Sequence, residues 1–296
     1  MNNLCKYGSC SVIVGENHYK NYYPAKDGKL LKITKIIDNH NEFKHLSEIR
    51  TIKNYNQYYS IPDEASYLLN SSSPFYEKLK HMVDEDAQNI FSGTLTCLYI
   101  DYAGNRDMLD TLVALRDYDN RSIWNSYTII FKFTKTIMEG LIYLHQKKIC
   151  HLDIKPENIM VNQYNKTFKI IDFGFASKEP FNDFVFNLRG TPGYFPKYFK
   201  EDIEIPWLPT IYANDLEPVN DTLPMISNRQ LVYKIDSYCF GRVLYFLRYV
   251  YQDIYTCACF SKNKKNIGKF NSIIRCLIDN NVHTRLTIEK TYYKHF

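Results

Sequence analysis

The sequence lacks a long uncharged apolar run, and this lack argues against a membrane span. Its most apolar stretch, residues 239–260, is interrupted by Arg242, Arg248 and Asp253, whereas a spanning helix needs about 20 consecutive apolar residues. The opening residues MNNLCKYGSC also lack the apolar segment of a secretory signal. We therefore expect a cytoplasmic protein with no membrane span.

The sequence also lacks paired cysteines at the spacing of a structural metal site. Of the eight cysteines, only Cys257 and Cys259 lie close together, and no second pair accompanies them. Common zinc sites need two such pairs. We expect free thiols in a reducing compartment. Repeats and low-complexity linkers are absent as well, which argues against a solenoid or a disordered chain.

The composition is that of an ordinary folded protein. The chain has 296 residues, of which 45% are hydrophobic and 23% are charged. This is enough for one large domain or for two lobes with a core. The net charge of +5 is mild and differs from the strongly basic composition of nucleic-acid-binding domains. We expect no nucleic-acid partner, and nothing in the sequence indicates an oligomeric state.

Apolar periodicity divides the chain into a strand-rich part and a helical part. Residues 5–36 alternate apolar stretches with turn residues, which predicts strands joined by hairpins. An apolar residue at every third position predicts a helix over residues 40–54. A longer helical stripe follows Ser122, and another helix is expected from Asp236. The junction between the two parts falls near residues 102–105.

Four motifs occur in a specific order: HLDIKPENIMV, IIDFGFAS, RGTPGYFP and DSYCFG. On this ordered set, the chain resembles eukaryotic-type protein kinases over nearly its whole length. The resemblance implies an α+β bilobal fold that transfers the γ-phosphate of ATP to protein hydroxyls. The implied parts are a small β-rich N-lobe (1–101), a hinge (102–107) and a larger, mainly helical C-lobe (108–296) with an enlarged connection (198–235).

The resemblance assigns catalytic and metal-binding roles. Asp153 would orient the acceptor hydroxyl, and Lys155 would hold positive charge against the transferring phosphoryl group. Asn158 and Asp172 would supply the oxygen ligands that Mg²⁺ prefers, with Mn²⁺ as an alternative metal. Lys155 and Thr191, which would brace Asp153, follow the serine/threonine pattern rather than the tyrosine pattern. The implied partners are ATP and a protein substrate with a serine or threonine acceptor.

Two more residues have competing candidates: the lysine that contacts the phosphates in the family and the glutamate that holds this lysine. In KLLKITKII, Lys32 lies inside a strand and best matches the family's lysine, with Lys29 and Lys35 as competitors. Glu48 resembles the helix glutamate that would hold this lysine, with Glu42 as its competitor. The plainer alternative is that Lys32 and Glu48 are surface charges.

The phosphate-covering loop departs most from the family pattern. Three glycines normally let backbone N–H groups approach phosphate. In KYGSCSVIVG, the three positions carry Lys6, Gly8 and Ser11, so only the middle glycine is kept. Leu30 is a second departure, because the family usually carries alanine there and leucine would crowd adenine.

The connector CLYIDYAGNRDML resembles the family's hinge. Ile100 would lie at the back of the adenine pocket, and Asp101 and Ala103 would present backbone groups to adenine. Asp107 would bind the ribose hydroxyls or cap a helix N-terminus, two roles that are compatible. The remaining nucleotide contacts implied by the resemblance are Ile13 and Met160.

Two C-lobe residues resemble structural residues of the family. Asp236 resembles the buried aspartate that fixes the catalytic loop. Arg285 resembles an arginine whose usual partner, a glutamate, is replaced here by Lys197. We expect Arg285 to find another acid or to stay solvated.

One residue of the first motif bears on regulation. Leu152 stands where the family usually carries an arginine that grips a phosphate on the activation segment. That segment, residues 172–197, offers few hydroxyls: Ser177, Thr191 and Tyr194. We therefore predict a kinase that is active without phosphorylation of this segment.

Two other functions remain open. The eroded glycine loop favours a catalytically weak nucleotide-binding pseudokinase scaffold, and small-molecule phosphotransferases share a similar aspartate-to-asparagine loop. The 26 tyrosines and the abundant asparagine, lysine and isoleucine are typical of an AT-rich genome, such as that of a protist or a large DNA virus. For a viral protein, the expected location is the host cytoplasm or the virion.

Overall fold

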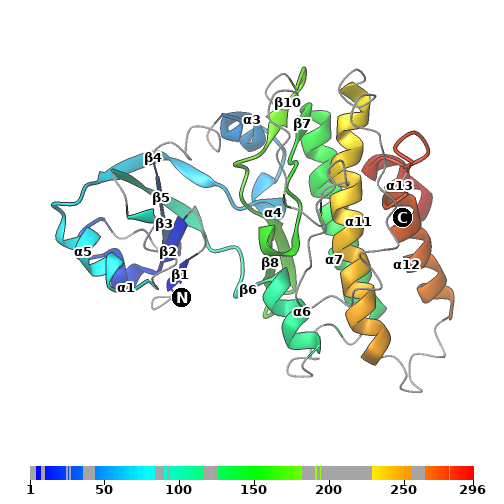
Figure 1. The fold of residues 1–296 in the computed structure, drawn as a ribbon, viewed down its shortest axis with the longest axis horizontal. Helices are drawn as coiled ribbons and strands as arrows, with labels where there is room; N and C mark the ends of the chain where they lie inside the picture. Colours follow the sequence, from blue (N-terminus) through cyan, green and yellow to red (C-terminus); the bar gives the residue numbers. More distant parts are fainter. Residues whose placement is uncertain are drawn as a thin grey trace.

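The computed structural model consists of a sheet-rich N-terminal lobe and a helical C-terminal lobe (Figure 1). This arrangement confirms the predicted α+β bilobal fold. The structure describes residues 5–7, 11–24, 26, 28–35, 44–83, 90–91, 94–116, 124, 126–181, 191, 194, 229–254, 264–279 and 281–296.

The N-terminal lobe contains a five-stranded antiparallel sheet with the strand order β1-β2-β3-β5-β4. In the central strand β3, Lys32 pairs with Ile13 of β2 and with Leu98 of β5. Because successive side chains of a strand point to opposite faces, Leu31 and Ile33 enter the core of the lobe and Lys32 faces away from it. The strands are β1 (Cys5–Tyr7), β2 (Ser11–Val14), β3 (Lys29–Lys35), β4 (Pro62–Leu69) and β5 (Leu95–Asp101).

Two short helices pack against this sheet, α1 (Glu16–Tyr19) and α5 (Pro74–Lys80). Tyr19 and Phe75 lie in the same buried cluster as the core residues of the strands. Helix α5 begins where the side chain of Ser73 accepts a hydrogen bond from the N–H of Phe75, which is the usual N-cap interaction. Neither these helices nor strand β4 was predicted from the sequence.

The C-terminal lobe is built around the long helices α7 and α11, which cross its centre (Figure 1). The helical stripe after Ser122 is confirmed by α7, whose buried residues include Ile130, Phe133, Ile137 and Leu141. Helix α11 contacts α6, α7, α12 and α13. The helices are α6 (Met108–Arg116), α7 (Tyr127–Gln146), α11 (Arg229–Ile254), α12 (Lys264–Leu277) and α13 (Ile288–His295).

Helix α11 begins at Arg229, earlier than the expected start at Asp236. Residues 229–235 are therefore helical and do not belong to the predicted connection. The rest of that connection, residues 198–228, lies outside the described residues. Within the described part of the chain, no helix combines the length and the apolar character that crossing a membrane requires.

The helix predicted over residues 40–54 is wrong in its extent. The structure has a short helix α3 (Leu46–Arg50) and then a turn and a second short helix, α4 (Tyr55–Tyr58). Asn54, between them, adopts the left-handed conformation with φ of 57°, which a continuous right-handed helix cannot contain. The described residues resume only at Lys44, so the beginning of the predicted range cannot be compared.

Short strands line the junction of the lobes. They are β6 (Arg106–Asp107), β7 (Ile149–Cys150), β8 (Ile159–Asn162), β9 (Thr167–Ile170) and β10 (Ser177–Lys178), with a 3₁₀ turn η2 (Pro156–Asn158) before β8. Gly104 crosses from one lobe to the other against β8. A Cβ atom at this position would lie 2.4 Å from the carbonyl oxygen of Val161, so only glycine fits without moving the backbone.

Candidate active site

A single buried carboxylate, Asp236 of α11, fixes the loop that follows β7. Its Oδ2 accepts a hydrogen bond from the N–H of His151 at 2.9 Å, and its Oδ1 accepts one from the N–H of Leu152 at 2.8 Å. The Nε2 atom of His145 lies 2.9 Å from Oδ2. Burial by itself would raise the pKa of Asp236, but His145, His151 and the N–H of Leu152 outweigh it and hold that pKa below its ordinary value. The predicted anchoring role is confirmed.

Leu152 has an unusual backbone conformation and a fully buried side chain. Its φ is 64°, a left-handed conformation that costs a residue other than glycine about 1–2 kcal/mol. The hydrogen bond to Asp236 helps to hold it. The side chain is 1% exposed and belongs to the core of the C-terminal lobe. This position therefore offers an apolar group to the core and no cation to the activation segment.

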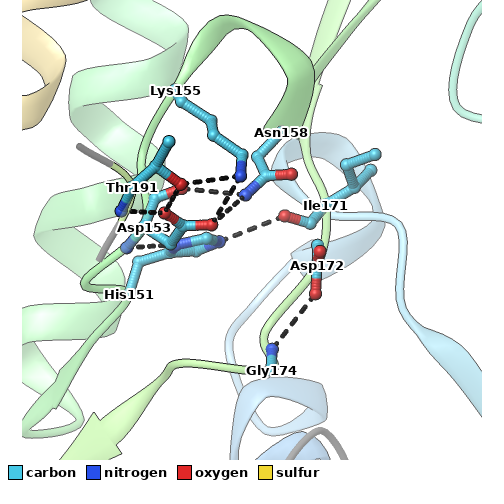
Figure 2. A network of polar contacts seen from close by, with 8 residues as sticks. All are labelled: His151, Asp153, Lys155, Asn158, Ile171, Asp172, Gly174 and Thr191. Atoms are coloured by element: carbon cyan, nitrogen blue, oxygen red, sulfur yellow. Dashed lines mark hydrogen bonds and ion pairs between the residues drawn. The ribbon is translucent and has the colours of Figure 1, made fainter. Parts of the chain in front are cut away.

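The carboxylate of Asp153 is held by three other predicted site residues (Figure 2). Its Oδ1 accepts hydrogen bonds from the hydroxyl of Thr191 at 2.6 Å and from the N–H of Thr191 at 3.0 Å. Its Oδ2 lies 2.9 Å from the amide nitrogen of Asn158 and 3.1 Å from the ammonium of Lys155. Lys155 also donates to the Thr191 hydroxyl at 2.8 Å. The structure therefore brings these four residues together around one buried carboxylate.

Asp172 lies next to this network (Figure 2). Its Oδ1 accepts a hydrogen bond from the N–H of Gly174 at 3.2 Å. Burial favours the neutral acid, but the charge of Lys32 and the bond from Gly174 outweigh burial and lower the pKa of Asp172. Asp172 is therefore ionised at neutral pH and is suited to bind a cation.

Asn158 is oriented so that its amide oxygen remains available. Its amide nitrogen donates to the carbonyl oxygen and to Oδ2 of Asp153, both at 2.9 Å. Both Asn158 and Asp172 line the cavity between the lobes. One neutral oxygen and one ionised carboxylate form a ligand set that suits Mg²⁺, which prefers oxygen ligands. The residues present fit the predicted metal.

A cavity of about 330 Å³ lies between the lobes, a volume in the usual range for small-molecule sites. Each predicted nucleotide or metal residue that the structure describes contributes to its lining: Ser11, Ile13, Lys32, Ile100, Asp101, Ala103, Asp107, Asn158, Met160 and Asp172. Gly8 is outside the described residues. Leu30 also lines the cavity. This position is consistent with the prediction that its side chain would crowd adenine.

The cavity distinguishes Lys32 from its competitors. Among the three lysines considered, Lys32 is the one that lines it. Lys29 instead forms ion pairs with Asp63 at 3.1 Å and with Asp101 at 2.8 Å, and Lys35 pairs with Leu95 at the far end of the sheet. The structure therefore supports the predicted register of this strand.

Glu48 has a different partner from the one expected. The ammonium of Lys178 lies 2.7 Å from each of its two carboxylate oxygens. Helix α3 lies beside strand β10 (Figure 1), which explains how residues 130 positions apart meet. Both side chains are more than one-third exposed, so the pair is weak, of the order of 0–1 kcal/mol. Glu48 is not among the residues that line the cavity, and the competitor Glu42 lies outside the described residues.

Sequence reasoning left several cavity-lining residues without a role. They are Ser60, Pro62, Gly104, Asn105 and Ile171. Ser60 and Pro62 precede or begin a strand that the sequence did not reveal, and they belong to no motif. Gly104 and Asn105 lie within the predicted hinge, where the Gly-Asn pair was a usable turn signal.

Asp107 performs the capping role that the sequence left open. Its Oδ1 accepts a hydrogen bond from the N–H of Asp110 at 2.7 Å, in the first turn of α6. Because Asp107 also lines the cavity, capping does not exclude contact with a ligand.

Glu157 also lines the cavity, near Asp107. Burial is the main cause of its raised pKa, and the nearby carboxylates of Asp107 and Asp153 add to the effect against the opposing charge of Lys155. Within the described part of the chain, its Oε2 has no hydrogen-bond partner.

Arg285 does not stay solvated, because its side chain is buried. It is 2% exposed, and its Nε donates to the carbonyl oxygen of Asp279 at 2.7 Å. Its guanidinium also lies 4.7 Å from the centre of the Tyr238 ring. Backbone carbonyl groups and an aromatic ring therefore contact the buried guanidinium of Arg285. Lys197, which replaces the glutamate that usually pairs with this arginine, lies outside the described residues.

Comparison with known proteins finds similarity to protein kinases. The model of the protein kinase domain family matches residues 28–197. The chain is 33% identical over 97 residues to the probable serine/threonine-protein kinase HSL1 of Saccharomyces cerevisiae, which covers 33% of this chain and 6% of the yeast protein. It is 44% identical over 66 residues to mitogen-activated protein kinase kinase kinase 3 of Arabidopsis thaliana, covering 22% of this chain and 11% of that protein.

A third relative matches a shorter segment more closely. The chain is 60% identical over 47 residues to myosin light chain kinase 3 of Danio rerio, covering 16% of this chain and 7% of that protein. In all three cases, the matched segment is a small part of the relative's length.

Proposed function

The chain belongs to the protein kinase family, and from this premise we propose that it transfers the γ-phosphate of ATP to serine and threonine hydroxyls of proteins. The observation that carries the proposal is the network around Asp153, in which Thr191, Lys155 and Asn158 hold one carboxylate beside a nucleotide-sized cavity. The serine/threonine preference is supported by Lys155 and Thr191 and by the name of the yeast relative.

The two ends of the cavity suit the two ends of ATP. The apolar side chains of Leu30, Ile100 and Met160 would enclose the base, and Lys32 would meet the phosphates. Bound Mg²⁺ would neutralise phosphate charge, held by the oxygens of Asn158 and Asp172.

In the transfer step, Asp153 acts on the protein substrate. Its carboxylate accepts the hydrogen of the serine or threonine hydroxyl and directs the oxygen at the γ-phosphorus. Lys155, 3.1 Å from that carboxylate, stabilises the negative charge of the transferring group. Thr191 keeps both side chains in position through its hydroxyl.

We expect the purified chain to transfer label from radiolabelled ATP to serine and threonine residues of a generic basic protein in the presence of Mg²⁺. Removal of the metal with EDTA is expected to abolish transfer, because Asn158 and Asp172 cannot neutralise the phosphates by themselves. Phosphoamino-acid analysis of the product checks the acceptor type. Label found only on tyrosine would contradict the proposed specificity.

The pairing of Glu48 with Lys178 favours one alternative, a nucleotide-binding scaffold of weak activity. In the family, the helix glutamate holds the phosphate-binding lysine, so a glutamate engaged elsewhere weakens that support. Binding of ATP without transfer to several acceptors, with either Mg²⁺ or Mn²⁺, would establish the scaffold instead of the kinase.

We expect activity to be independent of phosphorylation of the activation segment. Leu152 is buried in the core and so provides no cation for a phosphate. Treatment of the purified chain with a broad-specificity phosphatase, followed by removal of the phosphatase, is expected to leave the initial rate of transfer unchanged. A mock-treated sample is the control, and loss of most of the activity after treatment would contradict the prediction.

A further inference from the structure

The base end of the cavity contains a hydroxyl that the family resemblance does not assign. Ser60 lines the cavity together with Asp101, and its Oγ donates a hydrogen bond to the carbonyl oxygen of Asp101 at 2.8 Å. We propose that Ser60 sets the base specificity of the site, so that GTP as well as ATP serves as phosphate donor. This inference rests on the proposed function, since it concerns the nucleotide of the same site.

Ser60 is held firmly in this position. Its N–H donates to the carbonyl oxygen of Ile170 at 3.1 Å, and the preceding residue, Tyr59, forms a β-bridge with Ile170. The hydroxyl of Tyr59 in turn donates to the carbonyl oxygen of Gly140 in α7 at 2.5 Å. Ser60 is 7% exposed. The hydroxyl is therefore fixed at the hinge while remaining free to rotate about its own bond.

Apolar residues flank Ser60 and Asp101 along the chain in the cavity lining, whereas the Asp101 carboxylate pairs with Lys29. These apolar residues of the cavity wall are Pro62, Ile100 and Ala103. Polar groups of a base that enter such a wall must find partners, because an unpaired buried polar group costs about 1–3 kcal/mol. The hydroxyl of Ser60 and the carbonyl of Asp101 are therefore positioned to read the polar edge of the base.

Adenine satisfies this pair without changing it. Its 6-amino group is a donor and can use the second lone pair of the Asp101 carbonyl, while Ser60 continues to occupy the first. Its N1 is an acceptor, for which the N–H of Ala103 is the candidate donor. A bare carbonyl would accept adenine equally well.

Ser60 makes a difference to the binding of guanine. Guanine presents an acceptor, O6, next to a donor, N1–H. Without Ser60, the carbonyl oxygen of Asp101 would face guanine O6, and both of these atoms are acceptors. With Ser60 present, the hydroxyl can turn to donate to O6, and the Asp101 carbonyl that it releases can accept N1–H. The pair therefore offers a donor and an acceptor that complement guanine.

The test compares ATP and GTP as phosphate donors for the wild type and for Ser60→Ala. The wild type is expected to use the two with kcat/KM values within about tenfold of each other. Because Ser60→Ala leaves a bare carbonyl, it is expected to lower kcat/KM for GTP by about tenfold or more relative to ATP, which corresponds to the loss of one hydrogen bond. Thr134→Val is the matched control, since it removes another buried hydroxyl that donates to a backbone carbonyl, remote from the cavity.

The readout separates this inference from the proposed function. Transfer from ATP, with GTP more than about a hundredfold poorer in the wild type, would overturn the role of Ser60 and leave the kinase proposal standing. Transfer from neither nucleotide would overturn both. An equal loss for ATP and GTP in Ser60→Ala would show a structural role only and would also overturn the inference.

A wild-type measurement provides a second test that requires no variant. Inosine triphosphate carries the same O6 and N1–H edge as GTP but lacks the 2-amino group. It is expected to serve as a donor about as well as GTP, because the Ser60–Asp101 pair reads only that edge. Exclusion of inosine triphosphate while GTP is accepted would show that the 2-amino group is read instead, and would overturn the assignment to Ser60.

Discussion

Asp153→Asn is expected to lower kcat for phosphoryl transfer by about a thousandfold, the range that positioned general-base groups contribute. The amide cannot take the hydrogen of the substrate hydroxyl, although it occupies nearly the same volume. Thr191 can still donate to its oxygen, although the amide nitrogen then faces Asn158 and Lys155, which now donate to Oδ2. The KM for ATP should change little, because Asp153 is not among the residues that line the nucleotide cavity. Steady-state kinetics with ATP and a protein acceptor measure both parameters.

Direct binding of ATP to the variant is the internal control. Retained binding with lost transfer assigns Asp153 to the chemical step, whereas joint loss assigns it to folding of the site. Asp110→Asn, at an exposed position of α6, is the matched substitution and should leave kcat unchanged. A kcat for Asp153→Asn within tenfold of the wild type would contradict the role given to this carboxylate.

Asp236→Ala is expected to have the largest effect on stability, lowering the free energy of unfolding by about 3–5 kcal/mol. The substitution leaves the N–H groups of His151 and Leu152 and the ring of His145 without the acceptor that now satisfies them. The left-handed backbone at Leu152 also loses its restraint. Activity should fall together with stability, because Asp153 directly follows Leu152 in the loop that Asp236 fixes. Denaturation with urea, followed by fluorescence, measures the first effect.

The pH dependence of unfolding offers a second readout for Asp236. Its pKa is lower in the folded chain than in the unfolded chain, because His145, His151 and the N–H of Leu152 outweigh burial. A carboxyl of this kind stabilises the fold at pH values above its unfolded pKa of about 3.9. The stabilisation is lost as the pH falls through the lower, folded pKa. Asp236→Ala should therefore show a shallower loss of stability below about pH 4.

Asp63→Asn is the comparison for the buried anchor. Asp63 pairs with Lys26 and Lys29 at a position that is 30% exposed, and surface pairs contribute about 0–1 kcal/mol. Equal destabilisation by Asp236→Ala and Asp63→Asn would contradict the view that burial and backbone hydrogen bonds make Asp236 the stronger support.

The parts of the site that the sequence predicts well are those in which chemistry restricts the residue type. A hydroxyl-orienting carboxylate, a phosphate-facing lysine and two oxygen ligands leave few choices, so Asp153, Lys155, Asn158 and Asp172 stand out in short motifs. The structure brings all four to one place. The fold class follows from the same motifs, because their order along the chain is that of a bilobal kinase.

The parts that the sequence misses depend on contacts between distant segments. Ser60 is held at the cavity by hydrogen bonds to Ile170 and Asp101, both far from it in sequence, and an isolated serine carries no signal. The partner of Glu48 is Lys178, and nothing in either local pattern indicates that they meet. The helix predicted over residues 40–54 ends at Arg50, and neither this end nor the left-handed conformation of Asn54 is indicated by apolar periodicity.

The burial of Leu152 has a consequence for any arginine placed at this position. The side chain at this position is 1% exposed among apolar neighbours. A guanidinium placed there would lose its hydration, at a cost of several kcal/mol. Surrounding core residues would have to change first to open a path to solvent. The packing around Leu152 therefore disfavours an arginine at this position unless its neighbours change with it.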